Sequence, residues 1–201
     1  MGRRAELVEE TRLRITAATA RLHTTVGPAK TSIAAIAEEA GVTRLTVYRH
    51  FPDLATLFEA CRDHWQAEHP IPDPMAWAES EDGASRVRRG LTELYGWYHA
   101  NADALYPIYR DMATMPRSSQ EAMRDDRRRL AALLLGGSLG GSQTRRPNDP
   151  RAHSYARHLV DYRTWRSLVI ENGLSDAEAA ELGVHILTGP SAARSTPAGP
   201  I

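Results

Sequence analysis

Residues 31–57 read TSIAAIAEEAGVTRLTVYRHFPDLATL, and this stretch decides the fold of the chain. Its apolar residues from Ile33 to Ala40 follow the spacing of one helical face. Gly41 can end that helix because glycine adopts the left-handed conformation at little steric cost. Thr43 is suited to cap a second short helix, and Asp53 a third. A helix, a glycine turn and a short polar helix are typical of a helix-turn-helix.

The second short helix, over residues 44–50, carries side chains suited to reading DNA. Arginine can bond two guanine acceptors at once, and threonine offers a hydroxyl and a methyl group. Tyrosine and histidine can donate to phosphate. We expect DNA contacts from Thr31, Thr43, Arg44, Leu45, Thr46, Tyr48, Arg49 and His50. The spacing alone also permits two amphipathic helices of an ordinary bundle with a charged solvent face.

The run from Thr11 to Leu57 resembles the N-terminal domain of the tetracycline-repressor (TetR) family of one-component regulators. TRLRITAATARL at 11–22 and TSIAAIAEEAGVTRLTVYRHFPD at 31–53 carry the resemblance. It implies an all-α protein with a three-helix, helix-turn-helix DNA-binding domain and a helical ligand-binding and dimerisation domain. We expect the DNA-binding domain at 1–52, a linking helix at 53–69, the ligand-binding and dimerisation domain at 70–189 and a flexible tail at 190–201.

Turn signals along the chain separate the expected helices. His69 to Pro74 contains three prolines and should end the linking helix. In the first part of the chain we expect helices at 7–22, 33–40, 44–50 and 53–67, after a frayed arm at 1–6. In the second part we expect helices at 85–100, 102–115, 118–135, 151–171 and 175–188. The glycine-rich segment 136–150 is predicted to be a loop.

The distribution of charge and the single cysteine indicate the cellular compartment and the part of the chain that contacts DNA. Net charge is zero, but residues 1–50 hold eight Lys and Arg against five Asp and Glu, a modest basic excess at the DNA-reading end. Cys61 is the one cysteine, which excludes an internal disulfide and fits a small buried hydrophobe better than a redox sensor. The sequence has no signal peptide and no apolar run of membrane-spanning length. We therefore expect a cytoplasmic protein with no membrane partner.

The last two helices of the sequence predict a homodimer. Tyr162, Trp165, Leu168 and Val169 share one side of the helix at 151–171, and the helix at 175–188 has a face of apolar and small residues. The family resemblance implies that these helices pair with their copies in a four-helix bundle. The alternative is that both faces only complete the core of the monomer.

The aromatic residues of the second domain predict a pocket for an unidentified small-molecule effector of apolar or mixed character. Tyr98, Tyr109, Met112 and Trp165 are the expected lining residues, although aromatic stripes also fill ordinary helical cores. In the family, a shift of the linking helix changes the spacing of two recognition helices in a dimer. Half-sites on one face of B-DNA lie ~34–36 Å apart, so a small splay prevents simultaneous docking.

Motifs for catalysis are missing from the sequence. It lacks a G-x-S-x-G elbow, a phosphate-binding glycine loop and H-E-x-x-H, and its paired histidines are five residues apart. We expect no catalytic residues, metal or cofactor. The sequence favours a ligand-responsive repressor that binds a palindromic operator in double-stranded DNA. The alternatives are a helical small-molecule-binding module and a constitutive DNA-binding protein without an inducer.

Overall fold

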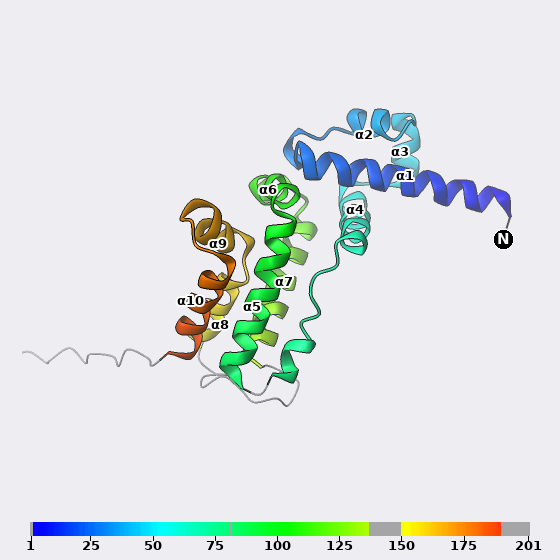
Figure 1. The fold of residues 1–201 in the computed structure, drawn as a ribbon. Coiled ribbons are helices and arrows are strands. Elements are labelled where there is room, and N and C mark those ends of the chain that lie inside the picture. Colours follow the sequence, from blue (N-terminus) through cyan, green and yellow to red (C-terminus); the bar gives the residue numbers. More distant parts are fainter. Residues whose placement is uncertain (1, 81, 137–149, 190–201) are drawn as a thin grey trace, which may run out of the picture.

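The chain is helical in the computed structural model, which describes residues 2–80, 82–136 and 150–189 (Figure 1). No strand occurs in these residues, so the predicted all-α class is confirmed. The first part, here called the head, contains α1 (Arg3–Thr25), the 3-10 turn η1 (Pro28–Lys30), α2 (Ile33–Glu39), α3 (Arg44–His50) and α4 (Leu54–Glu68). The second part, here called the body, contains η2 (Ala76–Glu79), α5 (Gly83–Ala100), α6 (Ala102–Arg110), η3 (Met112–Thr114), α7 (Arg117–Leu134), α8 (Pro150–Leu159), α9 (Tyr162–Arg166), the π-helical turn η4 (Ser167–Glu171) and α10 (Asp176–Thr188).

The head has a small hydrophobic core of its own. Ile15 of α1, Val47 of α3 and Leu57 of α4 are almost fully buried in one cluster. Glu39 of α2 pairs with Arg21 of α1 at 2.8 Å. In Figure 1, α2 and α3 lie together on one side of the long α1, and α4 runs from the head toward the body.

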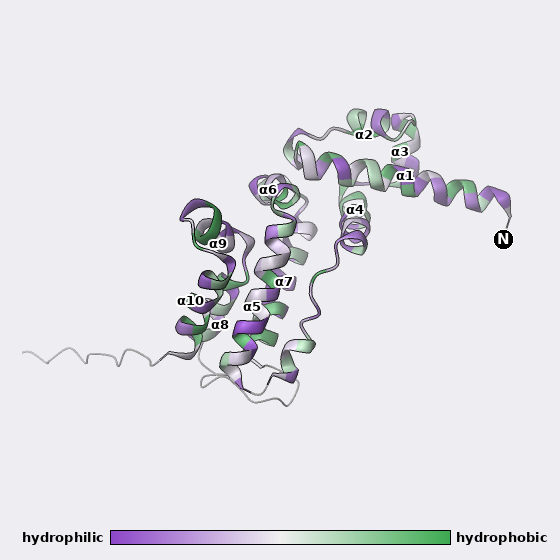
Figure 2. Ribbon diagram, in the orientation of Figure 1, coloured by the Kyte–Doolittle hydropathy of each residue, from purple (hydrophilic) through white to green (hydrophobic). Residues whose placement is uncertain are grey.

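A second, larger core fills the body. Helices α5 and α10 pack closely because Gly183 has no side chain: a Cβ there would lie 2.2 Å from a methyl carbon of Leu91. A Cβ at Gly90 would likewise lie 2.6 Å from a methyl carbon of Leu134 in α7. Figure 2 shows hydrophobic residues recurring along the α9 and α10 ribbons, at the side of the molecule away from the N-terminus.

Side-chain caps begin several helices, including the two for which the sequence predicts them. The hydroxyl of Thr43 accepts a hydrogen bond from the backbone N–H of Thr46, and Asp53 caps α4 in the same way. Ser175 and Glu178 form a reciprocal capping box at α10. These interactions satisfy N–H groups that have no partner inside the helix.

The helix predicted at 151–171 is broken, so that prediction is wrong. Helix α8 ends at Leu159, and the carboxylate of Asp161 caps α9. The phenols of Tyr95 and Tyr98 donate to the carbonyls of Leu159 and Val160, at 2.9 and 2.7 Å. Tyrosines of α5 thus satisfy carbonyls that a continuous helix would have satisfied itself.

Two further boundaries differ from the prediction. Helix α1 begins at Arg3, so the expected frayed arm is largely helical. Helix α6 ends at Arg110 instead of 115; a 3-10 turn follows, and Met115 is extended because it precedes Pro116. Within the described ranges, no helix is both long enough and apolar enough to span a bilayer. Most of the predicted loop at 136–150 and the tail at 190–201 lie outside the described residues.

Candidate nucleic-acid interface and internal cavity

The turn between α2 and α3 has the geometry that the sequence predicts. Gly41 has a φ of 64°, in the left-handed region, and Ser32 caps α2 through the N–H of Ala35. At the start of α3, the hydroxyls of Thr43 and Thr46 are hydrogen-bonded to each other at 2.9 Å. The backbone thus turns sharply and fixes the direction in which α3 leaves the head.

Helix α3 buries one face and exposes the other. Val47 is fully buried, whereas Leu45 is 77% exposed and Tyr48 is 54% exposed. Arg44 and Arg49 are also exposed, and within the described residues neither guanidinium has a hydrogen bond or ion pair. The outer face therefore presents two free cations beside a large apolar side chain.

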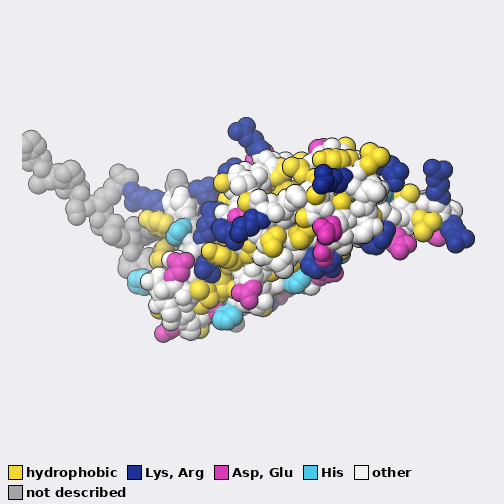
Figure 3. All heavy atoms as spheres, turned by 90° about the horizontal axis from the view of Figure 1, so that it is seen from above, with side chains coloured by type: hydrophobic (Ala, Val, Ile, Leu, Met, Phe, Trp, Pro, Cys, Tyr) yellow, Lys and Arg dark blue, Asp and Glu magenta, His cyan; other side chains and the backbone are white. Residues whose placement is uncertain are grey.

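The remaining predicted DNA contacts lie around this outer face. Thr46 and His50 are half-buried on α3, and Thr43 is exposed at its N-terminus. Thr31 precedes α2, and its hydroxyl donates to the carbonyl of Gly27 at 2.9 Å. In Figure 3, Lys and Arg side chains are spread among hydrophobic ones along the face seen from above, in keeping with the modest basic excess of the head.

A cavity of about 390 Å³, partly open to solvent, lies where head and body meet. Residues from α1, α4, α5, α6 and α7 all contribute to its wall. Its apolar and aromatic lining includes Phe58, Trp65, Ile71, Leu94, Trp97, Tyr98, Leu105, Ile108, Tyr109, Met115, Met123 and Leu130. A molecule held here would contact helices of both parts at once.

Two of the four predicted lining residues, Tyr98 and Tyr109, line this cavity. Burial raises the pKa of both phenols above the ordinary value, so they stay protonated, and the Tyr98 hydroxyl donates to the carbonyl of Val160. Met112 and Trp165 are not among the lining residues. The indole N–H of Trp165 donates to Asp176 of α10 at 2.8 Å, and Met112 lies in η3 with its sulfur near Arg163.

The part of the lining that comes from α1, α4 and α7 could not be predicted from the sequence. His23 and Cys61 meet there, with Nδ1 and Sγ 3.6 Å apart. Burial lowers the pKa of His23 to about 4 and raises the pKa of Cys61 to about 12, so both are neutral near pH 7. The apolar stripe of α4 was visible in the sequence, but a stripe does not reveal that the packed helices leave a cavity.

Ion pairs flank the cavity on the α7 side. Arg62 of α4 approaches Asp126 of α7, with 3.6 Å between Nη1 and Oδ2. The next residue, Arg127, pairs with Asp161 at the start of α9. Asp126 and Arg127 both line the cavity, so its wall is polar along one side of α7.

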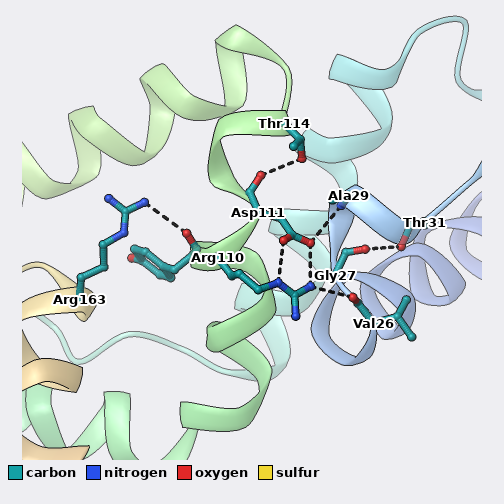
Figure 4. Close-up of polar contacts among 9 residues, drawn as sticks. Val26, Gly27, Ala29, Thr31, Arg110, Asp111, Thr114 and Arg163 are labelled. Carbon is teal, nitrogen blue, oxygen red and sulfur yellow. Dashed lines mark hydrogen bonds and ion pairs between the residues drawn. The ribbon is translucent and has the colours of Figure 1, made fainter. Parts of the chain in front are cut away.

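A polar clamp joins the body to the head beside this cavity (Figure 4). The guanidinium of Arg110 donates to the carbonyl of Val26 at 2.9 Å and also pairs with Asp111. The carboxylate of Asp111 in turn accepts the backbone N–H of Ala29 at 3.1 Å. Gly27 lies under both side chains with φ 97° and ψ 156°, a conformation almost restricted to glycine.

The clamp is continuous with the cavity wall. Tyr109 lines the cavity and directly precedes Arg110 and Asp111. Its carbonyl accepts a hydrogen bond from Arg163 of α9 at 3.2 Å (Figure 4). Gly27 and Pro28 alone indicate only a break after the first helix, because nothing in the sequence shows that α6 returns to this turn.

Comparison with known proteins agrees with the geometry of the head. Residues 15–61 match the family described as bacterial regulatory proteins, tetR family. The head is therefore similar to the tetR family over these residues. The match contains the core residues of all four head helices and the whole of the α2–turn–α3 unit.

Two relatives from Pseudomonas putida are similar to the chain over a limited stretch. They are the HTH-type transcriptional regulator TtgR and the probable HTH-type transcriptional regulator ArpR. Each is 43% identical over 81 residues, which is 40% of this chain and 37% of the relative. The match thus spans well under half the length of both relatives.

Proposed function

We propose that this protein is a sequence-specific DNA-binding regulator of transcription that acts as a repressor. The observation that carries the proposal is the outer face of α3, where Arg44 and Arg49 are free and Leu45 is 77% exposed. An exposed leucine of this size between free cations has no packing role in the head. It is suited to the methyl group of a thymine in the major groove.

The residues of the head divide into base readers and phosphate binders. Arg44 and Thr46, together with Leu45, lie at the N-terminal end of α3, the end that approaches base edges in helix-turn-helix proteins. Tyr48, Arg49, His50 and Thr31 are assigned to phosphates, and Thr43 to the cap that orients α3. The free guanidinium groups support this division because they need not break an ion pair to reach DNA.

The regulator is proposed to act as a homodimer through the last helices of the body. Leu182 and Ile186 of α10 are 38% and 41% exposed, and Ile170 of η4 is 48% exposed. These apolar side chains support a face that is covered by a second copy. A two-fold dimer would present two α3 helices to half-sites ~34–36 Å apart and so recognise a palindrome.

The cavity is proposed to bind an apolar or mixed-polarity effector that releases the DNA. Its wall combines α1 and α4 of the head with α5, α6 and α7 of the body, and the clamp at Gly27 continues from Tyr109. A ligand that pushes Tyr109 or α4 therefore changes the position of the head relative to the body. Such a rigid-body change would alter the separation of the two α3 helices in the dimer. This function belongs in the cytoplasm, where the operator DNA is found.

Selection from a random duplex library tests the proposal. The purified chain should enrich a palindrome, and its affinity should fall steeply as salt rises, because phosphate contacts release counterions. The Arg44→Ala variant should lose preference at one base pair. Arg129→Ala is a matched control, since Arg129 is exposed on α7 and outside the head.

The two alternatives give different results in the same experiment. A constitutive DNA-binding protein would enrich a sequence but would not release it when apolar compounds bind the cavity. A helical small-molecule-binding module would enrich no sequence and still bind such compounds. The exposed outer face of α3 favours DNA binding over the second alternative, because a module that binds only small molecules has no use for it.

A further inference from the structure

A second cleft, of about 310 Å³, lies in the body between α7 and the end of α8. It is lined by Arg124, Arg127, Arg128, Arg157, His158 and Asp161. Four guanidinium groups thus face one carboxylate. The cleft is built from body helices alone and has no residue in common with α3.

The ion pairs of the cleft leave two of its arginines uncompensated. Arg127 pairs with Asp161, and Arg128 pairs with Asp125 outside the cleft. The guanidinium of Arg124 donates only to the amide oxygen of Gln120, at 3.3 Å.

Arg157, like Arg124, has no carboxylate among the described residues to compensate its charge. It donates only to the hydroxyl of Ser154, at 3.2 Å, and in the described parts of the chain neither guanidinium meets a carboxylate. Like charges gathered in one cleft repel one another, so a bound anion would lower the energy of this arrangement.

The arrangement suits a phosphoryl group. Arg124, Arg127 and Arg128 share one face of α7, because residues three and four apart are neighbours on a helix. Arg157 approaches from α8, so guanidinium groups converge on the cleft from two elements. Planar guanidinium groups bind phosphate through paired, charge-assisted hydrogen bonds.

We propose that this cleft binds the phosphoryl group of a small molecule. The group can belong to a free anion or to the head of an amphiphile whose apolar part occupies the internal cavity. Arg127 lines both the cleft and the cavity, and Val160, which lines the cavity, directly precedes Asp161. Only the amphiphile form rests on the effector role proposed above for the cavity, and neither form requires DNA.

Titration calorimetry on the full chain tests the proposal with three probes: inorganic pyrophosphate, octyl phosphate below its micelle concentration and 1-octanol. We expect both phosphate probes to bind. The double variant Arg124→Gln, Arg157→Gln should weaken them by at least about tenfold, as expected for the loss of charge-assisted contacts. Its binding of 1-octanol should be unchanged.

A second double variant, Arg117→Gln and Arg129→Gln, is the matched control. It removes the same charge from exposed α7 positions that line neither cavity nor cleft, so it should leave all three affinities unchanged. Far-ultraviolet circular dichroism establishes that both variants are folded. Octyl phosphate binding much tighter than pyrophosphate identifies an amphiphile, and equal affinities identify a free anion.

Two results would overturn the proposal. One is that neither phosphate probe binds the folded chain. The other is that both double variants weaken binding equally, which would mean that only net charge matters. Binding of 1-octanol together with either result would refute the phosphoryl site and leave the cavity as an apolar site, so the two proposals fail separately.

Discussion

Replacing Gly27 by alanine tests whether the clamp holds the head on the body. The backbone of Gly27, at φ 97° and ψ 156°, costs another residue ~1–3 kcal/mol. The new Cβ would also lie 2.3 Å from Oδ2 of Asp111 and 2.4 Å from Nη2 of Arg110. Both side chains would have to move away from the turn.

That movement removes the bonds from Asp111 to Ala29 and from Arg110 to Val26. A hydrogen bond to a charged group such as the Asp111 carboxylate contributes ~1.5–3 kcal/mol, whereas the bond of the exposed Arg110 is screened by solvent and adds little. The free energy of unfolding should therefore fall by about 3–5 kcal/mol in Gly27→Ala. Urea unfolding, followed by circular dichroism, measures the change.

Gly173→Ala is the matched control for this experiment. Gly173 has a φ of 76°, and a Cβ there meets nothing within 4 Å, so only the backbone cost of ~1–2 kcal/mol applies. If Gly27→Ala is no more destabilising than Gly173→Ala, the clamp contributes nothing and the reasoning fails. In the proposed regulator, Gly27→Ala should also weaken the coupling between the effector and DNA.

Four further predictions address the head, the dimer and the buried pair. Arg44→Ala should cost ~1–3 kcal/mol in DNA binding and relax one base pair, whereas Tyr48→Phe should weaken all sequences alike in the same titrations. Ile186→Asp should convert a dimer to a monomer in sedimentation experiments; an unchanged mass would exclude α10 from the interface. Burial lowers the pKa of His23 from 6.5 to about 4, so between these pH values only the unfolded chain binds a proton on this imidazole. The free energy of unfolding should thus fall by about 3 kcal/mol as pH drops from ~6.5 to ~4, and His23→Gln should remove this part of the pH dependence. Cys61, with its pKa raised to about 12, should resist iodoacetamide in the folded chain and react after denaturation, as judged by mass spectrometry.

The helices of the head follow from local signals in the sequence. Gly41, Thr43 and Asp53 act on residues within four positions of themselves, so their roles could be predicted without knowledge of the packing. The break at Asp161 could not be predicted in this way. It depends on Tyr95 and Tyr98, which lie more than sixty residues earlier and supply the donors for the carbonyls at the end of α8.

The difference between local signals and long-range contacts also explains which of the predicted pocket residues line the cavity. Of the four residues that the aromatic pattern suggested, Tyr98 and Tyr109 line the cavity. Trp165 lies on a neighbouring helix, but its indole is held by Asp176, a contact that periodicity cannot reveal. The clamp was missed for a related reason, since Asp111 meets Ala29 across 82 positions of sequence.

The separation of the two hydrophobic cores has an evolutionary consequence. The clusters around Val47 and around Trp165 share no residue, so a substitution that repacks one leaves the side chains of the other in place. In the proposed regulator, selection can therefore preserve the DNA sequence that the head binds while the body changes its ligand. The contacts between the Gly27 turn of the head and Asp111 of the body have the opposite effect. A substitution in one of these two parts must be matched by a substitution in the other. Covariation between these two turns across relatives would reveal which lineages have kept this connection.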